Sequence, residues 1–112
     1  MPVLHICYDE SLEPAIRASG ELVAELSAAL CDKLDAVAEK CQVVLTRGLS
    51  VSPLPIYVEL KFRANTGRDD QRVADAMQSV ADILTSRLAT GVRIRGFAID
   101  QARLHALDVP TG

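Results

Sequence analysis

The chain has 112 residues, of which 49% are apolar and 4% aromatic, and its formal net charge at pH 7 is −3. This length suits one domain, so we expect a single domain over residues 1–112, with similar halves near 1–50 and 54–103 and a tail over 104–112. The acidic balance gives nucleic acid no electrostatic footprint, and no apolar run approaches the ~20 residues of a membrane-spanning helix. We therefore expect neither a nucleic-acid partner nor a membrane partner.

The three cysteines are Cys7, Cys31 and Cys41. Their odd number and irregular spacing indicate free thiols rather than a disulfide framework. The isolated His5 and His105 offer no paired zinc ligands. No basic region precedes the short apolar stretch at the N-terminus, which is therefore not typical of a signal peptide. A reducing, cytoplasmic setting is the expectation.

The first half of the chain predicts a strand, a helix and a strand. Residues 2–8 are apolar and β-branched, which favours a strand, and a loop through Pro14 follows. Ser19 is then a candidate N-cap for a helix. The apolar stripe of this helix recurs at threes and fours and consists of Leu22, Val23, Leu26, Leu30, Leu34 and Val37. Residues 42–46 predict the second strand, which ends near Gly48.

The second half repeats this pattern. Residues 56–63 alternate apolar and polar side chains, which is typical of a strand with one buried face, and residues 65–67 form a turn signal. Asp69 is a candidate N-cap for the second helix. The stripe of that helix consists of Val73, Met77, Val80, Leu84 and Leu88. Gly91 is placed to end the helix, and residues 92–99 predict the last strand.

The predicted order of elements is therefore β-α-β followed by β-α-β. Two such units can form one four-stranded mixed sheet with both helices on one face. This predicts an α/β (α+β) fold made of two βαβ repeats. Because the opposite face of the sheet stays uncovered in a single copy, we expect an oligomer.

Residues 55–88 resemble the subunit of 4-oxalocrotonate tautomerase, with Pro-Ile, a strand, a Gly-Arg turn and an acidic start to the helix. The double length of the chain is more similar to 5-carboxymethyl-2-hydroxymuconate isomerase. The chain thus resembles the tautomerase superfamily over most of its predicted topology. The motifs that carry the resemblance are Met1-Pro2 and Thr66-Gly67-Arg68.

This resemblance implies a homotrimer with three active sites near the N-termini and with no metal or organic cofactor. It implies enol–keto tautomerisation or 1,3-allylic proton transfer on a small unsaturated dicarboxylate or 2-oxo acid, in the catabolism of aromatic rings. A non-catalytic trimer that binds a small acid or a partner protein is the alternative. Dehalogenation or decarboxylation by hydration, other chemistries of the superfamily, are a third possibility.

Pro2 is the candidate general base. Within a chain its nitrogen is an amide without basicity, whereas removal of Met1 converts it to a secondary amine. Burial and nearby cations lower the pKa of such an amine, which brings it toward the neutral range useful for proton abstraction. Alternatively, Pro2 merely begins a strand. Pro55 is its repeat-equivalent and can never be a free amine, because Leu54 precedes it.

Arg68 is the second candidate catalytic residue, on the strength of the resemblance. It lies in a turn beside a predicted helix start, where anions bind. Its guanidinium can hold a carboxylate through two parallel hydrogen bonds and can stabilise a developing dienolate. Alternatively, it pairs in solvent with Asp69, Asp70 or Glu59.

Three further residues are candidates for binding substrate. Lys40 supplies positive charge where the isomerase family carries an arginine, although lysine lacks the rigid fork. Tyr8 and Phe62 can form pocket walls, but core packing is the usual role of such residues. Arg93 and Arg95 share one face of the last predicted strand, where they line a trimer channel or, as we prefer, form salt bridges between subunits.

Overall fold

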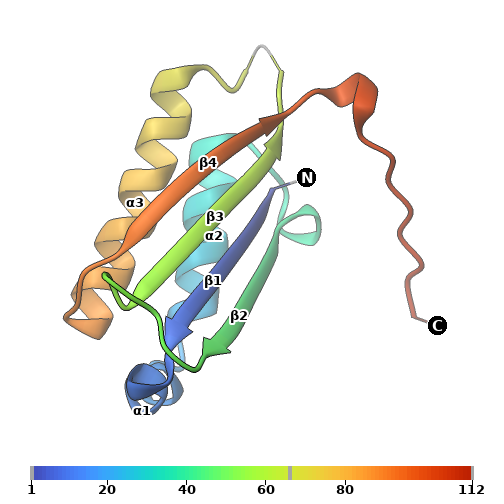
Figure 1. The fold of residues 1–112 in the computed structure, drawn as a ribbon. Coiled ribbons are helices and arrows are strands. Elements are labelled where there is room, and N and C mark those ends of the chain that lie inside the picture. The colour runs from blue at the N-terminus through green and yellow to red at the C-terminus, as the bar shows by residue number, and fades with distance from the viewer. Residues whose placement is uncertain (1, 66, 112) are drawn as a thin grey trace.

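A four-stranded sheet forms one layer of the molecule, and the two long helices lie together on one of its faces (Figure 1). This computed structural model describes residues 2–65 and 67–111. The predicted excision of Met1 and the first residue of the Thr66-Gly67-Arg68 motif therefore lie outside the described residues, as does Gly112, the last residue of the predicted tail.

The strands are β1 (Val3–Asp9), β2 (Gln42–Gly48), β3 (Ile56–Arg63) and β4 (Arg93–Ile99). The α-helices are α1 (Glu13–Ala18), α2 (Leu22–Leu34) and α3 (Asp70–Leu88), and the short 3₁₀ helices are η1 (Glu10–Leu12), η2 (Ala38–Lys40) and η3 (Gln101–Arg103). All four predicted strands and both predicted helices are present, each within two residues of its expected limits apart from the end of α2.

The strand order is β2-β1-β3-β4. The pairs β1–β2 and β3–β4 are parallel, whereas the central pair β1–β3 is antiparallel. This confirms the predicted mixed sheet. One end of the sheet, which we call the Pro2 end, is where β1 and β2 begin and β3 and β4 finish. The opposite end, where β3 and β4 begin, is called the Pro55 end.

The core lies between the sheet and the helices. Alternate residues of β1 and β3 face the helices, as the period-two pattern predicts. The buried side chains of these strands are Leu4, Ile6, Tyr8, Ile56, Val58, Leu60 and Phe62. Those of the helices are Leu22, Leu26, Leu30, Leu34, Ala76, Val80, Leu84 and Leu88. Burial of each leucine stabilises the fold by about 1.5–3 kcal/mol, so this one cluster holds both repeats together.

The prediction of a loop through Pro14 and an N-cap at Ser19 is wrong. Helix α1 occupies this segment, with Pro14 in its first turn, where the missing N–H is not needed. Ser19 follows the end of α1, and its hydroxyl donates to the Ala15 carbonyl at 3.0 Å. The next helix, α2, therefore starts later, after Glu21, and has no side-chain cap.

The helix ends also differ from prediction. Asp35 adopts the left-handed conformation (φ 51°) after α2, so Val37 lies beyond the helix and is 58% exposed rather than part of its stripe. At the end of α3, Ala89 and not Gly91 takes the left-handed position (φ 51°). The N-cap at Asp69 is confirmed, because its side chain accepts the Arg72 N–H at 2.8 Å.

The chain after η3 is extended and has no regular secondary structure up to Thr111. In Figure 1 it leaves β4 at the Pro2 end of the sheet and continues past β2. Its apolar side chains are largely open to solvent, with Leu107 86% and Val109 81% exposed. Among the described residues, none of the helices combines the length and the apolar character needed to cross a bilayer.

Candidate active site

Pro2 lies directly before β1 and is fully buried. Its carbonyl accepts the N–H of Gln42, the first residue of β2, at 2.9 Å. Having no N–H of its own, proline suits this position ahead of the strand. The burial also means that an amine at this position would be removed from water, which disfavours its charged form.

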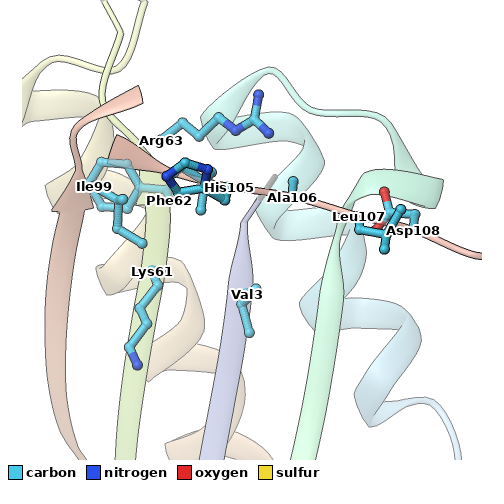
Figure 2. Close-up of a pocket in the computed structure, with 10 residues that line it drawn as sticks. Val3, Lys61, Phe62, Arg63, Ile99, His105, Ala106, Leu107 and Asp108 are labelled. Carbon is cyan, nitrogen blue, oxygen red and sulfur yellow. The ribbon is translucent and has the colours of Figure 1, made fainter. Parts of the chain in front are cut away.

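A pocket of about 320 Å³ lies at the Pro2 end, between the sheet and the tail. Its walls are the ends of β1, β3 and β4 on one side and the extended tail on the other (Figure 2). The lining residues are Val3, Lys61, Phe62, Arg63, Ile99, Leu104, His105, Ala106, Leu107 and Asp108. Mostly apolar walls with a few polar groups are typical of small-molecule sites.

Arg63, the last residue of β3, supplies a cationic group to this pocket. Figure 2 shows its side chain extending from the end of β3 in the direction of β1. Its Nε is buried and has no hydrogen-bond partner among the described residues. A buried donor without a partner is costly, so this end of the sheet carries a cation whose hydrogen bonding within the described residues is incomplete. The alternating pattern of β3 predicts that Arg63 lies on the uncovered face. The pocket itself could not be predicted, because residues of the tail form one of its walls.

Arg68 also lies at this end, but its bonds go to the backbone. Its Nε donates to the Leu34 carbonyl at 3.2 Å and its Nη1 donates to the Arg63 carbonyl at 3.1 Å. Arg72 adds a bond to the Lys33 carbonyl at 3.1 Å. The two arginines thus satisfy carbonyls at the C-terminus of α2, where positive charge is favourable. The predicted catalytic role of Arg68 stays a prediction.

The other candidate residues are divided between the two ends of the sheet. Phe62 lines the pocket and also belongs to the core. Lys40 is exposed in η2, just before β2, and is not among the pocket-lining residues. Tyr8 is buried six residues along β1 from Pro2, which is about 20 Å of extended strand. Within one chain, therefore, Pro2 and Phe62 lie at the same end, although only Phe62 lines the pocket, whereas Tyr8 lies at the other end.

Arg93 and Arg95 lie on the uncovered face of the sheet, as the alternation predicts. Their partners in the ladder are Tyr57 and Glu59. The Tyr57 hydroxyl donates to Glu59 at 2.9 Å, and this hydrogen bond raises the pKa of the tyrosine. The predicted salt bridges between subunits stay a prediction. Within residues 2–65 and 67–111, no group of three or more His, Cys, Asp or Glu side chains could hold a metal ion.

The fold is shared with several solved structures. The chain is similar to "Q0 fused 4-OT wild type symmetric trimer", with 15% identity, a TM-score of 0.76, and coverage of 93% of this chain and 90% of that one. It is similar to Pt0534 inactivated by 2-oxo-3-pentynoate, with 16% identity, a TM-score of 0.77, and coverage of 93% of this chain and 91% of that one. It is also similar to N1, a member of the cis-3-chloroacrylic acid dehalogenase family, with 12% identity, a TM-score of 0.76, and coverage of 93% of this chain and 79% of that one. No protein-family model and no curated protein matches the sequence. At these identities the similarity shows the fold alone.

Proposed function

We propose that the chain is a cofactor-free tautomerase that moves a proton within a small unsaturated 2-oxo or 2-hydroxy carboxylate. The N-terminal amine of Pro2, freed by removal of Met1, acts as its general base. The observation that carries this proposal is the burial of Pro2 at the end of the sheet that also holds an apolar pocket and the side chain of Arg63. Pt0534, which shares the fold, is described as inactivated by an unsaturated 2-oxo acid.

In this proposal the neutral amine of Pro2 removes a proton from the substrate and returns it at another position. The dienolate that forms between the two transfers carries negative charge. Arg63 binds the carboxylate through charge-assisted hydrogen bonds, and Phe62 forms an apolar wall. The positive charges of Arg68 and Lys40, which do not line the pocket, lower the pKa of the amine.

We propose that three copies assemble. The uncovered face of the sheet carries apolar side chains, including Val44 (37% exposed) and Phe97 (42% exposed), which association would bury. The fused 4-OT structure is described as a symmetric trimer. Sedimentation is expected to give three times the 12.1 kDa of one chain. A monomer would contradict the proposed assembly.

The substrate we propose is one like that of 5-carboxymethyl-2-hydroxymuconate isomerase, since that family shares the double length of this chain. Such a substrate carries a conjugated enol and a carboxylate and arises in the cytoplasmic catabolism of aromatic rings. The pocket of about 320 Å³ is of the size used by small ligands. Arg63 can hold the carboxylate while the apolar wall contacts the conjugated carbons.

The test combines intact mass with ketonisation of 2-hydroxymuconate. We expect the purified protein to lack Met1 and to accelerate ketonisation. In Pro2→Ala, kcat/KM is expected to fall by roughly 10²-fold or more, the range for loss of a general base. Pro55→Ala is the matched control, because Pro55 precedes β3 as Pro2 precedes β1, and it is expected to retain activity within a few-fold. A retained methionine, or equal activity in all variants, would contradict the proposed role of Pro2 as the base.

A further inference from the structure

Two thiols lie against each other next to Pro2. Cys31 belongs to the last turn of α2 and Cys41 directly precedes β2. Their sulfur atoms are 3.5 Å apart, and both residues are partly exposed. A disulfide requires about 2.05 Å between the sulfurs, so an approach of roughly 1.5 Å would suffice. We propose that Cys31 and Cys41 are a redox modification site, which hydroperoxides convert to a disulfide that restrains residues 35–41 beside Pro2.

The surroundings of Cys41 disfavour its thiolate. Burial and, secondarily, the hydrogen bond with Cys31 raise the pKa of the Cys41 thiol to about 11, while the charge of Arg68 acts in the opposite direction. Because a thiolate is the attacking species, Cys41 is a poor first nucleophile near neutral pH. Either order of attack gives the same disulfide, and the steps are written below with Cys31 attacking first.

The reaction balances with hydrogen peroxide as the oxidant. The Cys31 thiol loses its proton, the thiolate attacks one peroxide oxygen, and the O–O bond breaks. The hydroxide that leaves takes up that proton, so Cys31 sulfenic acid and one water form. The Cys41 sulfur then attacks the sulfenic sulfur, the S–O bond breaks, and the second water leaves as the S–S bond forms. Two thiols and one peroxide give one disulfide and two waters.

The position of the pair connects it to the candidate site. Cys41 is followed by Gln42, whose N–H donates to the Pro2 carbonyl at 2.9 Å. The disulfide would close a short loop that contains η2 and Lys40. It would therefore fix the start of β2 against α2 and, through the Gln42 hydrogen bond, restrain Pro2. An effect of the disulfide on catalysis rests on the proposed function, whereas the restraint of Pro2 by the disulfide does not.

Cys7 provides the matched control. It pairs with Thr46 in the β1–β2 ladder, five residues along β2 from Cys41, or about 15 Å of strand. Cys7 therefore cannot reach either partner in the folded protein. Cys7→Ser retains the proposed pair, whereas Cys31→Ser and Cys41→Ser each remove one member.

The experiment treats wild type and the three variants with hydrogen peroxide and measures intact mass without reductant. We expect wild type and Cys7→Ser to lose about 2 Da and two alkylatable thiols, and dithiothreitol to reverse both changes. Cys31→Ser and Cys41→Ser should each form no intramolecular disulfide, and oxidation of the remaining thiol of the pair should stop at a sulfenic acid that dimedone traps. A disulfide that needs Cys7, or oxygen addition in wild type without loss of 2 Da, would overturn the proposal.

Hydrogen exchange tests the restraint without any assay of activity. In oxidised Cys7→Ser, the Gln42 amide is expected to exchange more slowly than in the reduced protein. Equal exchange in the two forms would contradict the restraint. This readout also separates failure of the thiol proposal from failure of the proposed tautomerase, because neither mass nor exchange depends on turnover.

Discussion

The Pro2 end and the Pro55 end of the sheet have the same framework but different cavities. At each end a proline precedes a central strand, and its carbonyl accepts a backbone N–H, from Gln42 for Pro2 (2.9 Å) and from Asp9 for Pro55 (2.8 Å). The Pro2 end has a pocket of about 320 Å³, whereas the hollow beside Tyr57 at the Pro55 end is about 80 Å³. The two repeats therefore share one backbone framework, but only the Pro2 end combines it with a pocket of the size of a small ligand.

The two ends also differ in whether the polar side chains named below have hydrogen-bond partners within the chain. At the Pro55 end, the Asp9 carboxylate accepts the N–H groups of Val51 (3.1 Å) and Ser11 (3.0 Å), and Glu13 pairs with Arg47 at 2.6 Å. At the Pro2 end, Arg63 presents a buried Nε without a partner among the described residues. Groups satisfied within the chain hold the fold together, whereas Arg63 keeps one unpaired donor beside the pocket.

The largest expected difference between the ends is between Arg63 and Arg93. Removal of a hydrogen bond to a charged group costs about 1.5–3 kcal/mol, so Arg63→Gln is expected to reduce kcat/KM for ketonisation roughly 10- to 100-fold. Arg93→Gln alters the hollow at the Pro55 end and should change kcat/KM less than about 2-fold. Steady-state kinetics measures both, and equal losses in the two variants would remove the proposed distinction between the ends.

Arg68 tests whether charge at the Pro2 end tunes the amine. Arg68→Gln loses the hydrogen bonds to the carbonyls of Leu34 and Arg63, so we expect the free energy of unfolding to fall by about 1–3 kcal/mol. Because the cation also disfavours the protonated amine, the acidic limb of the pH–kcat/KM profile should move to higher pH.

Arg72→Gln is the control, because Arg72 also binds an α2 carbonyl. It should lower stability but leave the position of the acidic limb unchanged. The same displacement of the limb in both variants would show that stability, rather than the charge of Arg68, governs the profile.

At the Pro55 end, Asp9 tests whether hydrogen bonds within the chain stabilise the fold. Its hydrogen bonds, that from the Ser11 hydroxyl foremost and then that from the Val51 N–H, lower its pKa below the ordinary 3.8. A lowered pKa in the folded state means that the carboxylate stabilises the fold above pH 3.8, and that this contribution is lost as the pH falls below that value. Urea unfolding should show that Asp9→Asn is less stable than wild type at pH 6 and that the difference narrows toward pH 3. A constant difference would contradict this account.

The smallest expected effects are at the equivalent helix ends. Asp35 and Ala89 both adopt φ 51°, a conformation that is unfavourable for alanine and better tolerated by aspartate. Ala89→Gly is expected to raise the free energy of unfolding by about 0.5–1 kcal/mol, and Asp35→Gly by less. Chemical denaturation compares them, and destabilisation by Ala89→Gly would contradict the strain argument.

The sheet and the long helices could be predicted because their signals are local. Alternation over residues 56–63 and the apolar stripe of α3 each report which side of an element is buried. The segment of α1 was harder, since Pro14 favours a loop about as strongly as a first helical turn. Glycine is the usual residue after a helix, so the sequence predicts the end of α3 at Gly91. The left-handed conformation is instead taken by Ala89, a residue type that does not signal it.

The candidate site was less predictable than the fold. Pro2 could be selected from its chemistry and Phe62 from its strand. Arg63 could not be ranked above Arg68, because the pocket forms only when the tail lies across the Pro2 end. The contact between Cys31 and Cys41 likewise depends on how α2 meets β2 in three dimensions, which their spacing along the chain does not reveal.

The most direct test of the central claim changes only the nitrogen of Pro2. Ketonisation of 2-hydroxymuconate is compared between protein that begins at Pro2 and protein with a non-cleavable extension before Met1, both verified by intact mass. The extension leaves the proline ring in place but turns its amine into an amide. We expect kcat/KM to fall roughly 10²-fold or more in the extended protein. Equal kcat/KM in the two proteins would contradict the assignment of Pro2 as the base.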